Sequence, residues 1–162
     1  MLSINDFEIV KFEDKDIFNN WFEKYPQDHS DYLFSTIISW IDYAKYHYTI
    51  YKDSLIIFTM IDDIVRIRPP VGKINKPLFD EIIGIAKSTD AKYPIGAINK
   101  QTKEWIMNNY KLLKVLPHRE YFDYVYLSSD LADLIGARYS KIRNRLNKFK
   151  RKYDYEIEII GD

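Results

Sequence analysis

The chain has 162 residues, no cysteine, and equal numbers of basic and acidic residues, 24 of each, with 46% hydrophobic residues. This is a globular composition of one-domain size, and it excludes disulfides, thiolate zinc sites and a cysteine nucleophile. The first residues lack a signal-peptide pattern, and the longest apolar runs, such as 55–58, are too short to span a bilayer. We therefore expect a soluble, cytoplasmic protein without an integral membrane segment.

The first half of the chain predicts two short helices followed by an antiparallel meander. The first helix should begin near Asp14 and end before Pro26, and Ser30 should cap the second. Their expected buried faces are Ile17, Trp21, Phe22 and Tyr25 in the first, and Leu33, Phe34, Ile37, Ile38 and Ile41 in the second. Three strands should follow, at 46–51, 54–60 and 64–68, with turns at 52–53 and 62–63.

The second half predicts alternating helices and strands. A loop at 69–73 leads into a helix that buries Leu78, Ile82 and Ile85. The expected order is then strand 94–98, helix 102–109, strands 112–116 and 121–127, helix 129–135, a basic helix, and strand 155–160. This order indicates an α/β (α+β) fold with a mixed, mainly antiparallel sheet and helices on both faces. It fits the GNAT acyltransferase fold, although fold alone does not fix function.

The basic helix is the most distinctive segment. Between Gly136 and Tyr153 the chain has eight Lys or Arg and no Asp or Glu, which leaves sixteen basic against 24 acidic residues elsewhere. The apolar residues recur at spacings of three and four, on one helix face; they are Tyr139, Ile142, Leu146, Phe149 and Tyr153. The segment therefore predicts an amphipathic helix whose cationic face contacts an anion. The alternative is a solvated helix flank that only maintains solubility.

The stretch that includes Phe122–Tyr126 and Tyr139–Lys150 resembles the phosphatidylglycerol lysyltransferase C-terminal-like (lipid-synthetase C-terminal) family. The segments Phe12–Asp16, Ser30–Trp40 and Pro70–Lys73 agree with it. Members of that family are similar to two GNAT-like domains in tandem. They are relatives of Fem-type enzymes, which transfer an aminoacyl group from aminoacyl-tRNA to an amine or a lipid hydroxyl. The resemblance implies that residues 1–135 form the N-terminal GNAT-like domain, and 136–162 a linker helix and the start of a missing second domain.

The same resemblance places Lys141, Arg143 and Asn144 next to phosphate. Together with the charge pattern, it gives six candidate substrate- or phosphate-binding residues: Arg138, Lys141, Arg143, Asn144, Arg145 and Lys148. The expected partners are aminoacyl-tRNA or an anionic lipid headgroup, and a second GNAT-like domain or an oligomer. The chain alone is expected to be inactive, with no cofactor. The alternative function is a non-catalytic module that binds nucleic acid or an anionic surface through the basic helix.

Gly72 and Lys73 lie where GNAT enzymes hold the pyrophosphate of coenzyme A, at the entry to a helix. That chemistry requires several glycines, and this loop has one, so a turn is the favoured interpretation over cofactor binding. His29, His47 and His118 have no second ligand at metal spacing, and no metal site is expected.

The catalytic residues are not identified by the sequence. Glu81, Glu104 and Glu120 could each serve as a general base, but no pattern distinguishes one of them. Trp40 is interpreted as a core residue, with the alternative that it lines an acceptor groove with Tyr32 and Tyr43.

Overall fold

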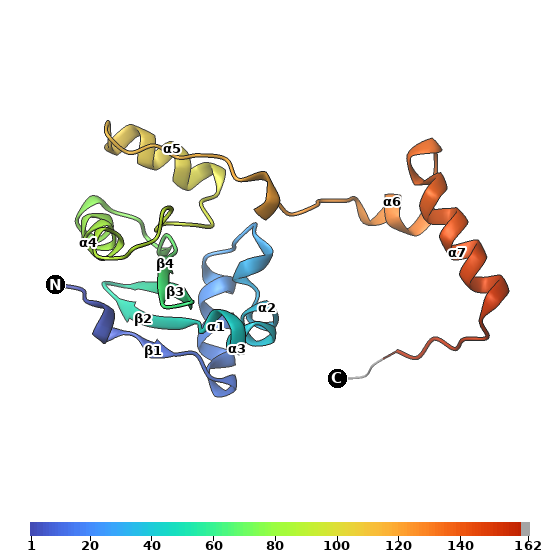
Figure 1. Ribbon diagram of the computed structural model, residues 1–162, viewed down its shortest axis with the longest axis horizontal. Coiled ribbons are helices and arrows are strands. Elements are labelled where there is room, and N and C mark those ends of the chain that lie inside the picture. Colours follow the sequence, from blue (N-terminus) through green and yellow to red (C-terminus); the bar gives the residue numbers. More distant parts are fainter. Residues whose placement is uncertain (160–162) are drawn as a thin grey trace. The chain divides into compact units, whose positions relative to one another are not determined.

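A computed structural model describes residues 1–159 of the chain (Figure 1). Contacts divide the chain into two compact units, one from Met1 to Tyr121 and a second that begins at Phe122. The sequence placed the boundary at Gly136; the division by contacts lies earlier and puts the short helix before Gly136 together with the basic helix.

Unit 1 is built on a five-stranded antiparallel sheet. Its strands are β1 (Glu8–Ile9), β2 (His47–Tyr51), β3 (Ser54–Ile61), β4 (Ile64–Ile67) and β5 (Val71–Gly72). The order is β1-β2-β3-β4, and β5 pairs with the first residues of β3. Strand β3 is therefore the centre of the sheet, and its first five residues are all buried.

The two hairpins of the meander match the sequence prediction because their turns are encoded locally. Lys52, Asp53, Asp62 and Asp63 all have positive φ, between 48° and 60°. Two consecutive left-handed residues match the right-handed twist of the flanking strands, so they favour a two-residue hairpin. The register that follows pairs Tyr51 with Ser54 and Ile61 with Ile64.

Helices cover both faces of this sheet, as the sequence predicted (Figure 1). They are α1 (Lys15–Lys24), α2 (Phe34–Ser39), α3 (Ile41–Ala44), α4 (Lys76–Lys87) and α5 (Lys100–Asn109). Side chains alternate along β3: Ile56 and Phe58 pack with α4 and α5, whereas Leu55 and Ile57 pack with α1 and α2. Because β3 is buried on both faces, its sequence is a continuous apolar run rather than an alternation of apolar and polar residues.

Four predicted strands are not formed. The segment 94–98 pairs with β4 at one position only, a parallel bridge between Ile67 and Ile95, and the left-handed Ala97 (φ 52°) ends the pairing. Segments 112–116 and 121–127 have no neighbouring strand within residues 1–159, and the latter begins in a 3₁₀ turn, η4 (Arg119–Tyr121). An extended segment becomes a strand only when a partner satisfies its backbone groups. Residues 155–159 are likewise irregular, and Ile160 lies outside the described residues.

The second predicted helix begins later than expected. Ser30 opens a 3₁₀ turn, η3 (Ser30–Tyr32), and His29 caps it by accepting the Asp31 N–H at 3.2 Å. Helix α2 then begins at Phe34, so Leu33 becomes its cap residue and is exposed rather than buried. The other 3₁₀ turns of unit 1 are η1 (Ile4–Asp6) and η2 (Phe12–Asp14).

Unit 2 consists of α6 (Ser128–Asp133), a 3₁₀ turn η5 (Ala137–Tyr139) and α7 (Ser140–Lys152), the predicted basic helix. Tyr139, the first residue of the predicted apolar stripe, is buried, but the rest of that stripe is at least 40% exposed. Among the described residues, none of the helices has the length and apolar content needed to cross a membrane.

Candidate functional site

Arg143 connects α7 to the turn that follows α6. Its Nη1 donates hydrogen bonds to the carbonyl oxygens of Leu134 and Gly136, the latter at 2.8 Å. Leu134 is left-handed (φ 49°) and ends α6, so its carbonyl has no helical partner within α6. The guanidinium supplies that partner, and this contact fixes the start of α7 against the end of α6.

Arg138 is held within unit 2 in a similar way. Its Nη2 lies 2.5 Å from the Asp130 carboxylate, and its guanidinium lies over the Tyr139 ring, 4.7 Å from the centroid. Burial raises the pKa of Tyr139 above its ordinary value, against the opposing effect of the Arg138 charge. These side chains border an open hollow of about 370 Å³ lined by Val125, Tyr126, Leu127, Asp130, Arg138, Tyr139 and Ile142.

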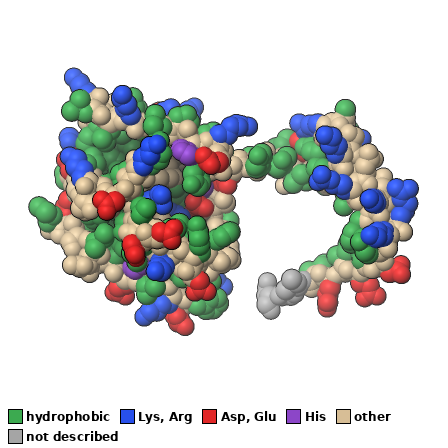
Figure 2. All heavy atoms as spheres, viewed as in Figure 1, with side chains coloured by type: hydrophobic (Ala, Val, Ile, Leu, Met, Phe, Trp, Pro, Cys, Tyr) green, Lys and Arg blue, Asp and Glu red, His purple; other side chains and the backbone are tan. Residues whose placement is uncertain are grey.

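The other four predicted residues form an exposed cationic face on α7. Lys141, Asn144, Arg145 and Lys148 point to solvent, and their side chains make no hydrogen bond or ion pair within residues 1–159. Figure 2 shows Lys and Arg gathered along α7, with acidic side chains beyond its C-terminal end. Lys141, Arg145 and Lys148 are spaced i, i+4, i+7 and so share one side of the helix.

A second open hollow, of about 400 Å³, lies on α7 itself. It is lined by Asn144, Asn147, Lys150 and Arg151, and Arg151 Nε donates to the Asn147 carbonyl at 3.2 Å. Amide and cationic donors that converge in this way suit the oxygens of a phosphate or carboxylate. Asn147, Lys150 and Arg151 lie in the basic run but were not among the predicted site residues. The only sequence signal that could have indicated them is their helical spacing from Asn144.

The six predicted residues thus separate into two groups. Arg138 and Arg143 are engaged with groups of unit 2, while Lys141, Asn144, Arg145 and Lys148 are available to an external partner. Phosphate binding by these residues stays a prediction.

Gly72 is the last residue of β5, and Lys73 follows it. Gly72 has φ 143°, and a Cβ on it would come within 2.7 Å of Ser54 Oγ, so glycine permits the close pairing of β5 with β3. The start of α4 is already capped, since Asn75 Oδ1 accepts the Leu78 N–H at 3.0 Å. The geometry of Gly72 therefore has a structural reason that needs no cofactor.

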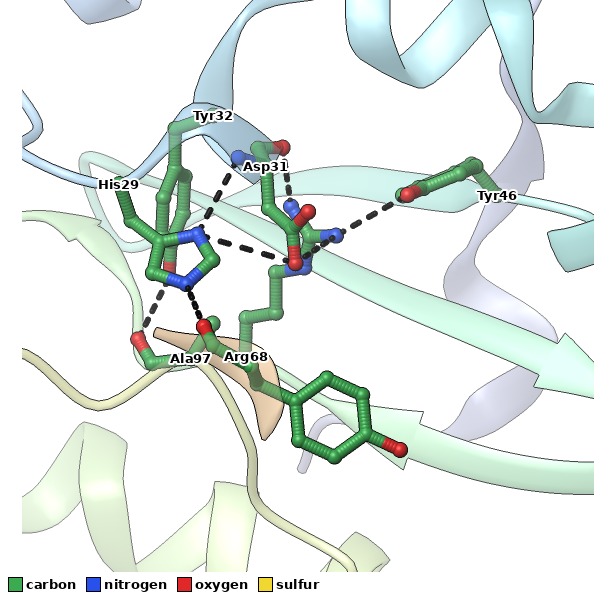
Figure 3. Close-up of polar contacts among 7 residues, drawn as sticks. His29, Asp31, Tyr32, Tyr46, Arg68 and Ala97 are labelled. Carbon is green, nitrogen blue, oxygen red and sulfur yellow. Dashed lines mark hydrogen bonds and ion pairs between the residues drawn. The ribbon is translucent and has the colours of Figure 1, made fainter. Parts of the chain in front are cut away.

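Unit 1 contains a polar cluster that the sequence did not reveal, centred on Arg68 (Figure 3). Arg68 follows β4 and is only 5% exposed; within residues 1–159 it is the one charged residue classed as buried. Its guanidinium donates to the Asp31 carbonyl at 2.6 Å and to the Tyr46 hydroxyl at 3.2 Å, with the Asp31 carboxylate at 3.6 Å. It also lies 5.1 Å from the ring centroids of Tyr32 and Tyr46.

This cluster joins η3, the residue before β2 and the residue after β4. Burial raises the pKa of Tyr32 to about 12, against the opposing charge of Arg68, and burial also raises the pKa of Tyr46. Both phenols therefore stay protonated at neutral pH and act as hydrogen-bonding groups rather than as bases. The Tyr32 hydroxyl donates to Ala97 O at 3.4 Å, and His29 Nε2 lies 3.1 Å from Tyr121 O.

The interpretation of Trp40 as a core residue was wrong, because this side chain is 56% exposed and contacts the exposed Tyr43 edge-to-face. Tyr32 is buried, so the alternative groove that combined it with Trp40 and Tyr43 is not formed either. Both predictions failed because the short α2 ends at Ser39 and α3 starts a new helical phase.

The three glutamates have different environments. Glu81 is engaged by Lys52, Tyr51 and the Leu2 N–H; Glu120 lies 3.0 Å from His118, and Glu104 is exposed on α5. These environments do not distinguish one of the three glutamates as a general base.

Comparisons with known proteins agree with the architecture. A family model for the phosphatidylglycerol lysyltransferase C-terminal region matches residues 22–162. Among solved structures, the chain is similar to a conserved protein of unknown function from Bacteroides thetaiotaomicron VPI-5482, with a TM-score of 0.76 at 23% identity. That match covers 91% of this chain and 50% of the other, so the chain spans half the length of that protein, and the likeness shows fold alone. No curated protein matched the chain. Since the family match covers most of its length, the chain belongs to the phosphatidylglycerol lysyltransferase C-terminal family.

Proposed function

We propose that this chain is the N-terminal GNAT-like domain of an aminoacyl-tRNA-dependent aminoacyltransferase, and that α7 contacts phosphates of its substrates. One observation carries the proposal: Lys141, Arg145 and Lys148 form a row of exposed cations that have no acidic partner within residues 1–159. Isolated helices normally stabilise themselves with acids at spacings of three and four, and α7 has none. An exposed cationic surface without acidic partners is typical of a phosphate-binding element.

The order of elements in unit 1 supports the GNAT-like part of the proposal. A strand, three short helices, an antiparallel meander, a helix, and a parallel bridge to β4 follow one another along the chain. The helices, the meander and the helix after it belong to the order that suggested a GNAT fold from the sequence, whereas the strands predicted after that helix are not formed. The family description names a lipid lysyltransferase, so phosphatidylglycerol is the acceptor that we propose to test.

The chemistry of this proposal is attack by a hydroxyl or amine on the activated ester of aminoacyl-tRNA. The acceptor oxygen or nitrogen forms a bond to the ester carbonyl carbon, the bond to the tRNA ribose oxygen breaks, and the acceptor proton leaves to the medium or to the ribose oxygen. A protein accelerates such a step by positioning the two substrates and stabilising the oxyanion. It needs no covalent nucleophile, which suits a chain without cysteine.

A transfer assay tests the proposal. Lysyl-tRNA carrying labelled lysine is incubated with vesicles that contain phosphatidylglycerol, with this chain alone and with this chain plus the other half of a homologous full-length protein. We expect little transfer by the chain alone and lipid-linked label when both halves are present. Absence of labelled lipid in both reactions contradicts the enzymatic proposal.

The second candidate function is a non-catalytic module that binds nucleic acid or an anionic surface. It is favoured by the exposure of the α7 cations, since Lys and Arg side chains that contact only phosphates bind nucleic acid without reading its sequence. Equal binding of charged tRNA, uncharged tRNA and an unrelated RNA of the same length, without transfer, supports this function over the first.

A further inference from the structure

The apolar stripe of α7 has the spacing of a coiled-coil seam. Its members are separated by 3, 4, 3 and 4 residues, so that Tyr139, Leu146 and Tyr153 take the a positions and Ile142 and Phe149 the d positions of a heptad. Ile142, Leu146 and Phe149 lie within α7, whereas Tyr139 belongs to η5 and Tyr153 is the extended residue that caps the end of α7. Strict a and d spacing is the narrow seam by which a helix pairs with another helix, whereas a wider stripe is usual for a helix that packs on a core.

Most of this seam is not covered within unit 2. Ile142, Leu146, Phe149 and Tyr153 keep 40–49% of their surface exposed, and only Tyr139 is buried. Phe149 contacts the rings of Tyr153 and Tyr155, at 5.1 and 5.2 Å between centroids, but these partners are themselves about half exposed. A contiguous apolar stripe on a helix of this length is an unused contact surface.

The residues that flank the seam determine what can occupy it. The e positions are Arg143 and Lys150, and the g positions are Arg145 and Lys152, so every flanking position is cationic. Residues at e and g select the partner of a coiled coil, since opposite charges attract and like charges repel across the seam. A second copy of α7 would place cations against cations at every flank.

We propose that the α7 seam binds an amphipathic helix of another polypeptide segment, with apolar residues at its a and d positions and Asp or Glu at its e and g positions. The flanking cations have no acidic partner of their own in unit 2: apart from the Arg138–Asp130 ion pair, none forms within residues 122–159. Charge complementarity therefore excludes self-pairing and specifies an acidic partner helix.

This surface shares only Arg145 with the row of phosphate-binding cations, and their other residues differ. Lys141 and Lys148 occupy c positions, which point away from a seam partner, whereas Lys150 and Lys152 flank the seam. The two activities can therefore be removed separately, and the proposal does not depend on phosphate binding.

The experiment uses two synthetic helical peptides of equal length, both with Leu at a and d. One peptide carries Glu at e and g, the other Lys, and fluorescence anisotropy measures their binding to the whole chain. We expect the Glu peptide to bind at least about tenfold more tightly than the Lys peptide, which corresponds to 1.4 kcal/mol. The Lys150→Glu, Lys152→Glu double variant should abolish this preference, since two cations and two acids then flank the seam, and Leu146→Asn should weaken Glu-peptide binding about tenfold or more.

The matched control is the Lys141→Glu, Lys148→Glu double variant, which changes the net charge equally but lies outside the seam. It should keep Glu-peptide affinity within about threefold of the unmodified chain. Circular dichroism should show that all variants keep their helix content. Equal weakening by the control and the seam variant overturns the proposal, as does failure of the Glu peptide to bind at about 100 μM. Concentration-dependent dimerisation lost in Leu146→Asn also overturns it, in favour of a second copy.

Discussion

At the scale of single residues, Glu81 joins three parts of unit 1. Its carboxylate lies 2.5 Å from Lys52 Nζ, accepts the Leu2 N–H at 2.5 Å, and accepts the Tyr51 hydroxyl at 3.1 Å. The Lys52 hydrogen bond, followed by the Leu2 hydrogen bond, lowers the pKa of Glu81 from 4.5 to about 2. The N-terminus, the first hairpin turn and α4 therefore depend on one ionised group.

This depressed pKa predicts a defined acid sensitivity. A carboxyl whose pKa is lower in the folded state stabilises the fold above the unfolded pKa, and this contribution is lost as pH falls from about 4.5 to about 2. Glu81→Gln should be less stable at pH 6, and its Tm should fall less between pH 4.5 and 2. Melting curves over pH 2–6 measure this, with Glu104→Gln on exposed α5 as the control that keeps the unmodified profile. Parallel curves for the unmodified chain and Glu81→Gln contradict the role of this carboxylate.

Arg68 is the second residue on which unit 1 depends. Replacing it with Met removes the donor for the Asp31 carbonyl and the Tyr46 hydroxyl, and each lost hydrogen bond to a charged group costs about 1.5–3 kcal/mol. We expect Arg68→Met to lower the free energy of unfolding by about 3 kcal/mol or more, whereas Arg66→Met, at an exposed position of β4, should change it by less than about 0.5 kcal/mol. Urea unfolding measures both. Equal stability of the two variants refutes a structural role for the Arg68 cluster.

At the scale of elements, two glycines lie in different environments: Gly72 is in close contact with β3, whereas Gly84 lies at an open position of helix α4. Gly72 has φ 143°, and an added Cβ would lie 2.7 Å from Ser54 Oγ and 2.9 Å from the Asp53 carbonyl. Gly84, in the middle of α4, has no such neighbour within 4 Å.

We therefore expect opposite effects of the same substitution at these two sites. Gly72→Ala should destabilise the chain by about 1–3 kcal/mol because it strains the pairing of β5 with β3. Gly84→Ala should stabilise it by about 0.5–1 kcal/mol because alanine has the higher helix propensity. Thermal unfolding of the two variants checks both signs. A neutral Gly72→Ala means that β5 tolerates a side chain and that the close approach is unimportant.

The elements also show what sequence reasoning can reach. The meander and the buried face of α4 were predicted correctly because turn residues and helical spacing are local signals, whereas the predicted face of α1 is only partly buried and missed the fully buried Phe18. Segments 112–116 and 121–127 were wrongly predicted as strands because pairing depends on a neighbour that local pattern cannot supply.

The candidate site was predictable only in part, for the same reason. The basic run identified α7, but the use of Arg143 to cap α6 depends on the left-handed Leu134, which has no local signature. The burial of Arg68 likewise depends on η3 and β2, both distant in the sequence.

At the scale of the whole molecule, the positive charge of α7 is nearly balanced by acidic residues in the segments before and after it. From Phe122 to the end, the chain has eight basic and seven acidic residues, and all the acids lie before or after α7 rather than on it. Long-range attraction of a polyanion is therefore weak, and binding relies on the few cations that face outward.

The most direct test of the central proposal is the affinity of tRNA for the whole chain as a function of salt. With about four phosphate contacts, the plot of log K against log salt should have a slope of about −3. The Lys141→Glu, Arg145→Glu, Lys148→Glu variant should bind at least about tenfold less tightly with a shallower slope. A control with the same charge change in unit 1, Lys103→Glu, Lys111→Glu, Lys114→Glu, should stay within about threefold of the unmodified chain. Equal affinities for the two triple variants would contradict the assignment of phosphate binding to α7.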